Sequence, residues 1–284
     1  MSDFVNITIN SLEELTKLNF KLAYWKFRGQ ADYDWPLSTT FERAYSTSKK
    51  ARGIEEGKIE AFKSLAHLYI KEKTPSYDDD VQWLHILQHY GGATRLLDFT
   101  YSKYIALYFA IKELLNFDAS ITCINTTQII KHNNKYIDFI AKNQTYQGEN
   151  KKVISPMIND DIINKCIKEG CKENYLIHYD AKLKNKRLYA QQGTFLFPTN
   201  INKSFQEHFF SFLECKEEDF KEQTIEELNK NLNDIKVVKI KVPKEIHKKA
   251  LQELFKMNIT ANILFPDIQG LTMWLNEVYT KVYE

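Results

Sequence analysis

The stretch "LQHYGGATRLLDFTYSKYIALYFA", residues 87–110, contains three elements in close succession. The helical spacing of its first apolar residues stops at Gly91 and Gly92, because glycine lets the backbone leave a helix. The Leu, Phe and Thr content of residues 94–100 indicates a short buried strand, and helical spacing resumes from Ser102. The unit is therefore a helix, a glycine pair, a strand and a second helix.

Helices and strands alternate irregularly on both sides of this unit. A capping-box spacing predicts a helix from Ser11 to about Asn19, and apolar residues that include Leu65 and Tyr69 predict another over residues 55–70. The other expected strands are 24–28, 119–124, 174–180, 193–198 and 235–242, and the other expected helices are 160–169, 217–232, 243–257 and 267–279. This mixture predicts an α+β fold with a mixed sheet and interleaved helices.

The chain shows no internal repeat and no break in composition that would divide it. We expect one domain over residues 1–284, with a polar insertion at about 125–160 and a helical insertion at about 200–234. The final apolar stripe, which includes Leu271, Trp274 and Leu275, is expected to close the core.

Composition excludes several classes of protein. The 284 residues are 43% hydrophobic, and 39 Lys and Arg face 37 Asp and Glu, so no strong overall charge indicates nucleic acid or anionic lipid as a partner. The longest apolar run, "IALYFAI" at 105–111, is too short to span a membrane, and the N-terminus lacks the basic start of a signal peptide. We expect a soluble, cytoplasmic protein without a membrane partner.

Most standard catalytic motifs are missing from the sequence. It contains no P-loop, no dinucleotide-binding glycine pattern and no G-x-S-x-G elbow. His85 and His89 have the spacing of zinc ligands, but "HILQH" lacks the Glu of the hydrolase motif, so no metal is predicted. The four cysteines form no C-x-x-C pair; we expect free and mostly buried thiols, with Cys166 and Cys171 on different helix faces.

One arginine stands at the end of an aromatic strand. In "AYWKFRG" the alternation places Arg28 on the face opposite Trp25 and Phe27, directly before Gly29. A guanidinium in this position needs an anionic partner, and two candidates are open: the carboxylate of Asp98 or the phosphates of a bound nucleotide.

Asp98 interrupts the apolar run "LLDFT", where a buried carboxylate is costly unless it is paired. Alternation places Asp98 opposite Arg95, so Arg28 or Arg187 is the better partner. A structural ion pair that holds the strands and a functional site remain alternative interpretations.

The segments "FRGQ", "LQHYGGATRLLDFTYSKYIALYFA", "RLYAQQGTFLFP" and "ILFPDIQGL" resemble, in this order, the signature blocks of the FRG domain family, named for its Phe-Arg-Gly motif. The blocks extend over about 27–276, so the resemblance implies that residues 1–284 form a single FRG-type domain. Family members are found in bacterial and phage genomes, which implies a role in defence or toxicity.

A weaker resemblance is to ADP-ribosyltransferases of the Arg, Ser, Glu type. It implies an ADP-ribosyltransferase-like fold and NAD as co-substrate, with the phosphates held by Arg28. Gln191, Gln192 or Thr194 stands where these enzymes have a catalytic Glu, and an amide cannot act as a base. A catalytic chain would therefore need another carboxylate, for which Asp98 is the candidate, with His89 as general base.

The predicted site has two parts. The candidate catalytic residues are Arg28, His89, Asp98 and Gln191. The candidate substrate-binding or cofactor-binding residues are Gln30, Tyr90, Thr94, Arg95, Thr100 and Tyr101, of which Tyr90 or Tyr101 would stack on nicotinamide and Thr100 would bond near the ribose.

The alternative is a non-catalytic module that binds a nucleotide or nucleic acid at the same residues. For a nucleic-acid-directed toxin, phosphates would contact the basic run Lys182, Lys184, Lys186 and Arg187. A nucleotide ligand is expected under both interpretations, and the target of the chain stays open.

Overall fold

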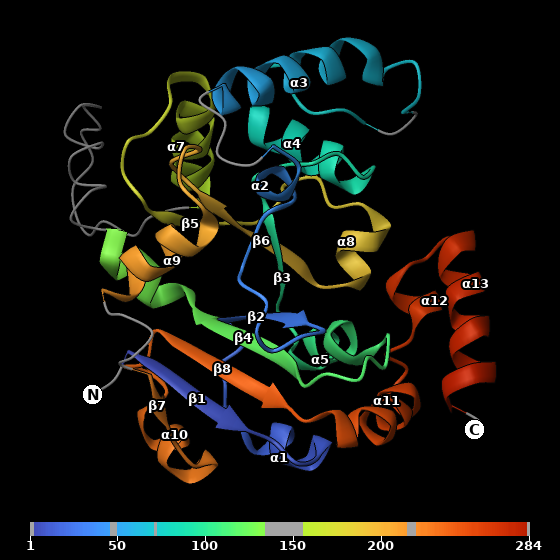
Figure 1. The fold of residues 1–284 in the computed structure, drawn as a ribbon. Helices are drawn as coiled ribbons and strands as arrows, with labels where there is room; N and C mark the ends of the chain where they lie inside the picture. The colour runs from blue at the N-terminus through green and yellow to red at the C-terminus, as the bar shows by residue number, and fades with distance from the viewer. Residues whose placement is uncertain (1–2, 46–49, 71–72, 134–155, 215–219, 283–284) are drawn as a thin grey trace.

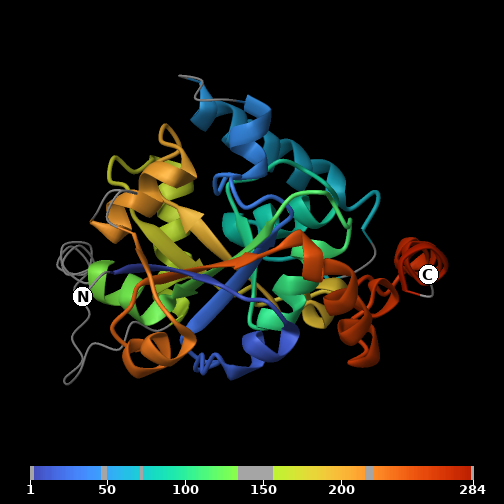
Figure 2. The same ribbon diagram turned by 60° about the horizontal axis from the view of Figure 1, so that its bottom comes forward.

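The computed structural model describes residues 3–45, 50–70, 73–133, 156–214 and 220–282. Their strands form one eight-stranded sheet in the order β5-β6-β3-β2-β4-β8-β1-β7, with helices on both faces (Figures 1 and 2). The strand β1 pairs in parallel with β7 and β8, and the other neighbours are antiparallel. The predicted α+β class with a mixed sheet is confirmed.

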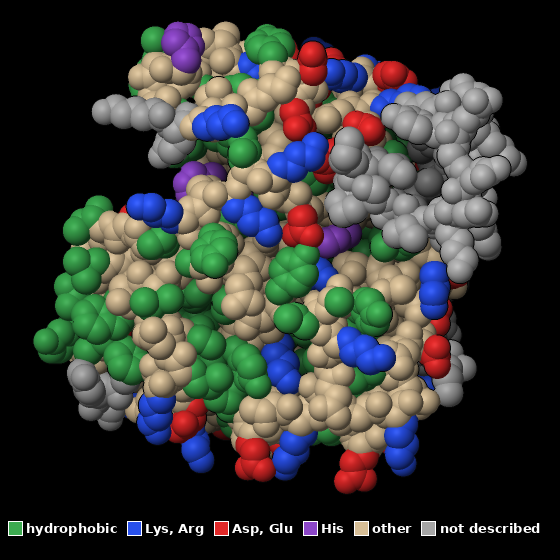
Figure 3. Space-filling model, turned by 180° about the vertical axis from the view of Figure 1, so that it is seen from behind, with side chains coloured by type: hydrophobic (Ala, Val, Ile, Leu, Met, Phe, Trp, Pro, Cys, Tyr) green, Lys and Arg blue, Asp and Glu red, His purple; other side chains and the backbone are tan. Residues whose placement is uncertain are grey.

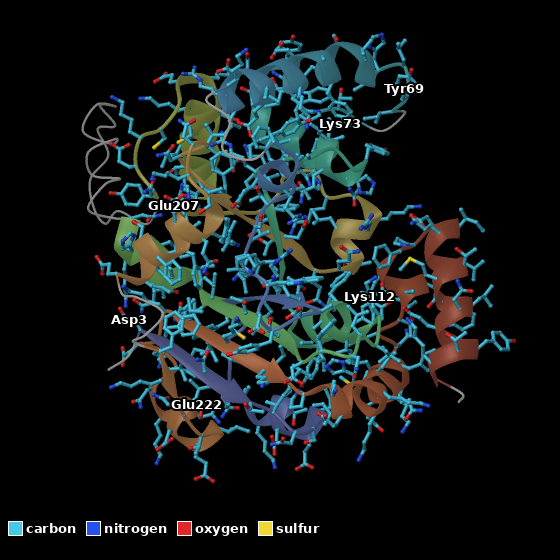
Figure 4. The ribbon with its side chains drawn as sticks, viewed as in Figure 1. Asp3, Tyr69, Lys73, Lys112, Glu207 and Glu222 are labelled. Carbon is cyan, nitrogen blue, oxygen red and sulfur yellow. The ribbon has the colours of Figure 1, made fainter. Side chains whose placement is uncertain are left out.

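The strands are β1 Phe4–Thr8, β2 Trp25–Gln30, β3 Leu97–Thr100, β4 Ala119–Asn125, β5 Leu176–Tyr179, β6 Gly193–Pro198, β7 Lys221–Glu222 and β8 Val237–Val242. The short β7 lies at one edge of the sheet, where Figure 4 shows Glu222. The strand β1 was not predicted, and β2 continues one residue beyond Gly29.

The helices are α1 Leu12–Lys17, α2 Thr40–Tyr45, α3 Ala51–Ala66, α4 Asp80–His89, α5 Lys103–Ile111, α7 Pro156–Glu169, α8 Lys186–Ala190, α9 Phe205–Leu213, α10 Ile225–Asn231, α11 His247–Lys256, α12 Ala261–Leu264 and α13 Ile268–Glu277. Two short turns are η2 Lys244–Ile246 and η3 Val278–Val282, and residues 126–133 are also helical. The helices α2, α8 and α12 were not predicted. Much of the predicted polar insertion lies outside the described residues. The predicted helical insertion contains α9 and α10 but also the strand β7, so the helix expected over 217–232 was wrong at residues 221–222, and α10 begins only at Ile225.

The sheet is divided into two wings. The strands β2 and β3 are joined at a single pair, Phe27 opposite Thr100, beyond which they diverge. One wing contains β5, β6 and β3, and the other contains β2, β4, β8, β1 and β7. In Figure 1 the first wing lies above the second and runs more steeply. This divergence leaves room between the wings next to β2 and β3.

The wings have separate hydrophobic cores. The apolar face of the longer wing packs against α5, α11 and α10, and that of the shorter wing packs against α3, α4 and α7. A third cluster lies beneath α9. Gly29 permits the close approach of α5 to β2, because a Cβ added at this glycine would lie 1.9 Å from the Ala106 carbonyl oxygen.

The buried face of α3 differs from the predicted one. Leu65 is exposed, and so is Tyr69, which lies beyond the end of the helix at Ala66, whereas Glu55 and Lys63 are buried. Both charges have buried partners: Lys63 pairs with Asp80, and Glu55 pairs with an arginine at the start of β3. The spacing rule was wrong here because an ion pair lets a charged side chain take an interior position.

The last helix closes the core only in part, because Trp274 packs against the core of the longer wing and the other two residues of the predicted stripe do not. Leu271 and Leu275 on α13 are 43% and 41% exposed, because α13 packs mainly on α12 and η3 instead of on the sheet. Figure 3 shows hydrophobic side chains gathered on this side of the molecule. The C-terminal segment is held to α5 by Lys281, whose Nζ donates to the backbone carbonyl of Lys112, labelled in Figure 4.

Three cysteines are described, and all three are free thiols, as expected. Cys215 lies outside the described residues. Cys166 and Cys171 were expected on different faces of one helix, which was wrong because α7 ends at Glu169. Gly170 has a φ of +81° and turns the chain, so that the Cys171 thiol lies within hydrogen-bond distance of the Cys166 thiol. The hydrogen bond from Cys166 lowers the pKa of Cys171 to about 7. Within the described ranges, no helix combines the length and apolar character needed to cross a membrane.

Candidate functional site

A cavity of about 380 Å³ lies where the two wings separate. Its walls come from β2, β3, α4, α5 and α8, so chain segments that are far apart in the sequence meet there. Figure 3 shows a hollow at this side of the molecule, above the hydrophobic surface of the C-terminal helices. The lining residues used below are Arg28, His85, Gln88, His89, Asp98, Thr100, Arg187 and Gln191.

Arg28 is directed into the gap between the wings. Its Nη1 donates to the backbone carbonyl of Asp98 at 2.8 Å, which ties β2 to β3 beyond their last strand pair. Its Nε is buried and has no hydrogen-bond partner among the described residues. Burial lowers the pKa of the guanidinium and the Asp98 carboxylate raises it, but an arginine keeps its charge in either case. Arg28 therefore has donor capacity that the fold does not use.

Asp98 is exposed, so the prediction of a buried carboxylate was wrong. Its neighbours Leu97 and Phe99 are buried, whereas the Asp98 side chain is exposed at the cavity, whose lining also includes Phe99 and Thr100. The amide of Gln88 donates to Asp98 Oδ1 at 2.8 Å, and Gln88 in turn accepts from the Thr94 hydroxyl. The carboxylate is thus held in place by an amide, and it acts on the Arg28 charge without forming a salt bridge to any described residue.

The helix α4 contributes three polar side chains from one face: His85, Gln88 and His89. Burial lowers the pKa of His85 to about 4, so this imidazole is neutral at pH 7. Its Nδ1 is buried without a hydrogen-bond partner in the described part of the chain. The helix ends at His89, close to the predicted stop at Gly91 and Gly92. Gly91 has a φ of +86°, which turns the chain away from the helix axis.

The opposite wall is formed by α8 and its C-cap. The Arg187 guanidinium lies 4.6 Å from the centre of the Phe265 ring, and it has no ion pair with a described carboxylate. Gln191 accepts from the Thr100 hydroxyl through its backbone carbonyl at 2.7 Å and donates from its side chain to the Leu264 carbonyl at 3.1 Å. The wall is therefore linked both to β3 and to the C-terminal helices.

The charge of the lining favours an anionic ligand. The lining contains the guanidiniums of Arg28 and Arg187 and the carboxylate of Asp98. The hydrogen bond from Arg28 to Asp98 goes to the backbone carbonyl and not to the carboxylate. Guanidinium groups bind phosphate with two parallel hydrogen bonds. Neutral donors and acceptors on His85, Gln88 and Gln191 surround them. The cavity combines the groups that a phosphorylated polar molecule requires.

The structure brings together the four candidate catalytic residues, Arg28, His89, Asp98 and Gln191, which all line this cavity. Of the six candidate binding residues, only Thr100 lines it. The other five, Gln30, Tyr90, Thr94, Arg95 and Tyr101, lie outside the lining.

Three of these five are engaged in structural contacts. Arg95 is buried and forms a bidentate pair with Glu55, at 2.8 Å and 2.6 Å. Thr94 is buried and orients Gln88. The side-chain amide of Gln30 donates to the carbonyls of Trp35 and Pro36.

The two tyrosines have different surroundings. Tyr90 is 56% exposed and contacts the His89 ring edge-on. Tyr101 donates to Asp180, and its ring lies beneath Lys26 at 4.3 Å.

Sequence reasoning missed His85 and Gln88 as lining residues. The spacing from His85 provided a signal, because Gln88 and His89 follow it by three and four positions and residues at these spacings share a helix face. The basic run is also less available than its sequence suggests. Lys182 pairs with Asp160 at 2.6 Å, and Lys184 lies 3.9 Å from Asp180. No group of three or more described His, Cys, Asp or Glu side chains is arranged to hold a metal ion.

One comparison with known proteins gave a match. Residues 23–119 match the family model of the FRG domain, and this range includes Arg28, His89 and Asp98. The chain therefore contains an FRG domain. No curated protein and no solved structure matches it. The segments that supply Arg187 and Gln191 lie beyond the matched range.

Proposed function

We propose that the cavity between the wings binds a nucleotide whose phosphates contact Arg28 and Arg187. The observation that carries this proposal is the unused donor capacity of Arg28 at the wall of a cavity of about 380 Å³: among the described residues Nη1 has a hydrogen-bond partner, and Nη2 and Nε have none. This volume lies within the range of small-molecule sites, and guanidiniums are the preferred protein groups for phosphate.

Binding of NAD, ADP-ribose and inorganic pyrophosphate to the purified chain, measured by calorimetry, tests the proposal. Arg28→Ala is expected to weaken binding about tenfold or more, since it removes charge-assisted hydrogen bonds to phosphate. Arg187→Ala should weaken binding less, because the Arg187 guanidinium loses its contact with the Phe265 ring when it binds a phosphate. Lys256→Ala is the charge-matched control, as Lys256 is exposed on α11 and does not line the cavity.

Retention of pyrophosphate affinity by a folded Arg28→Ala variant would show that the phosphates bind elsewhere. If the unchanged chain binds none of the three probes, the proposal fails entirely. Circular dichroism and urea unfolding establish that each variant is folded.

A second candidate function is ADP-ribosyl transfer from NAD, for which the exposed Asp98 carboxylate in the same cavity is the supporting observation. A carboxylate opposite the bound ribose would stabilise the positive charge that develops as the bond to nicotinamide breaks. His89 would accept the proton of the attacking nucleophile. The nicotinamide group would leave with the bonding electrons, and the nucleophile would form the new bond to ribose.

Asp98→Asn separates transfer from binding, because the amide keeps the shape of the side chain and removes its charge. We expect this variant to bind NAD with an affinity close to that of the parent and to release nicotinamide at least about a hundredfold more slowly. Chromatographic measurement of nicotinamide release is the assay. If the parent chain binds NAD and releases no nicotinamide, the binding module is the correct interpretation.

A defence or toxicity role, which the family resemblance implies, is tested in bacterial cells. Expression of the parent chain should slow growth or reduce phage plating, and Arg28→Ala at equal protein level should not.

A further inference from the structure

A second cavity, of about 520 Å³, lies on the face of the longer wing that bears polar side chains. Its floor is the sheet, with Asn6 from β1, Thr122 from β4 and Lys239 from β8. Its walls are residues 33–37, which follow β2, and the helix α9. In Figure 1 the chain after β2 crosses in front of the sheet on its way to α2, and α9 lies to one side.

Strand register places the floor residues in one row. Asn6 is opposite Lys239, Lys239 is opposite Thr122, and Thr122 is opposite Arg28. Residues paired in this way point to the same face of a sheet. The row therefore leads from Thr122, which lines the second cavity, to Arg28, which lines the first.

Asn6 has an unused acceptor at this floor. Its side-chain Oδ1 is buried and has no hydrogen-bond partner in the described residues. A buried polar atom is normally paired, because an unmade hydrogen bond costs free energy. Asn6 lines a cavity large enough for a ligand, and rotation of its side-chain amide about a soft torsion would bring this oxygen to a donor of the ligand.

The walls of this cavity are aromatic and firmly held. Trp35 is 52% exposed at the rim, and Phe210 and Phe220 lie near one another with almost parallel rings, 17° apart. The side chain of Gln30 donates to the carbonyls of Trp35 and Pro36, at 3.3 Å and 3.2 Å. The backbone N–H of Leu37 donates to the side chain of Gln206 on α9, which ties the two walls together. Gln30 of the "FRGQ" segment therefore holds residues 35 and 36 in the wall of this cavity.

We propose that this second cavity binds a nucleobase, either of a free nucleotide or of an unpaired nucleotide in a strand. Aromatic side chains stack on the π-face of any base. An Asn side chain offers an acceptor and a donor side by side, which matches the polar edge of a base. The Nζ of Lys239 lies 4.1 Å from the centre of the Tyr33 ring, and it would place a positive charge near the bound nucleotide. The site is separate from the proposed phosphate site at Arg28.

Nucleosides test this proposal without involving the phosphate site, just as pyrophosphate tests the phosphate site without a base. Adenosine, guanosine, cytidine and uridine are titrated into the full chain while tryptophan fluorescence is recorded. Stacking on the exposed Trp35 should quench the emission. Trp35→Phe should abolish the quenching and keep calorimetric affinity within about threefold, because a phenyl ring still stacks.

Asn6→Ala should weaken the affinity for the bound nucleoside about tenfold, because it removes the floor acceptor. Thr8→Ala is the matched control, since Thr8 lies two residues along the same strand, is exposed and does not line the cavity. The affinity for pyrophosphate should be the same in both variants as in the parent chain.

A single-stranded RNA of eight nucleotides distinguishes the two sources of the base. Tighter binding of the RNA than of any nucleoside, with the same loss in Asn6→Ala, assigns the site to a strand; equal binding assigns it to a free nucleotide. The proposal is overturned if neither the nucleosides nor the RNA quench Trp35, or if Thr8→Ala reduces binding as much as Asn6→Ala does. A pyrophosphate result, positive or negative, leaves this conclusion unaffected.

Discussion

Two arginines next to β3 have opposite surroundings. Arg95 is 3% exposed; its Nε and Nη2 donate to both carboxylate oxygens of Glu55, and its Nη1 donates to the carbonyls of Pro198 and Thr199. Arg28 has one described hydrogen bond, to a main-chain carbonyl, and lines a cavity. An arginine whose donors are satisfied by the fold stabilises it, whereas one with a buried unused donor at a cavity is placed to bind a ligand.

The largest effect is expected from breaking the Arg95 pair. Glu55→Ala leaves the guanidinium buried without its carboxylate, which should reduce the free energy of unfolding by about 3–5 kcal/mol. Urea denaturation measures this change. Glu56→Ala is the control, because Glu56 forms an exposed pair with Arg52 that is worth about 1 kcal/mol or less. Equal losses in the two variants would contradict the structural role of Arg95.

The position of Arg28 depends on the glycine that follows it. Gly29→Ala would place a methyl group against the Ala106 carbonyl of α5, so we expect a loss of about 1–3 kcal/mol and weaker pyrophosphate binding. Gly53 in α3 has no atom within 4 Å of an added Cβ, so Gly53→Ala should stabilise the chain by about 0.5–1 kcal/mol. Thermal unfolding of both variants checks the opposite signs, and a neutral Gly29→Ala would show that α5 can move away.

Arg28 itself should matter more for binding than for stability. Arg28→Lys keeps the charge and loses the planar fork, so we expect pyrophosphate affinity to fall about tenfold and unfolding free energy to fall by about 1 kcal/mol. Calorimetry and urea denaturation are compared on the same preparation. A large loss of stability with unchanged binding would place Arg28 with Arg95, among the structural arginines.

A smaller, pH-dependent effect should come from buried histidines. Burial lowers the pKa of His85 and of His208 to about 4, from an unfolded value near 6.5. His208 Nε2 also accepts from the Asn200 N–H, which requires the neutral ring. Between pH 6.5 and about 4 the unfolded chain binds more protons than the folded chain, so stability should fall as the pH is lowered through this range.

Urea unfolding at pH 7 and pH 5 measures the effect, and His85→Gln should reduce the difference. An unfolding free energy that is the same at both pH values would show that these rings are accessible to solvent.

Local patterns predicted much of the fold. The helix end at Gly91 and Gly92, the strand that carries Asp98 and the helix after Ser102 all follow from spacing and turn chemistry, and the structure has them. The short elements β1, α2, β7, α8 and α12 were missed because none has enough periodic residues to give a signal. The buried face of α3 was mistaken because the pattern treats a charged residue as exposed, although Glu55 has a buried partner 40 positions away in the sequence.

The sequence by itself determined the class of fold, the FRG segment and four residues, Arg28, His89, Asp98 and Gln191, that the structure brings to one cavity. Only the tertiary structure decided that Arg28 bonds to the main chain of Asp98 instead of its carboxylate, and that Arg95 pairs with Glu55. Alternation specifies the face to which a side chain points. Alternation does not specify which distant residue the side chain contacts, because this contact depends on how the two wings of the sheet diverge and pack.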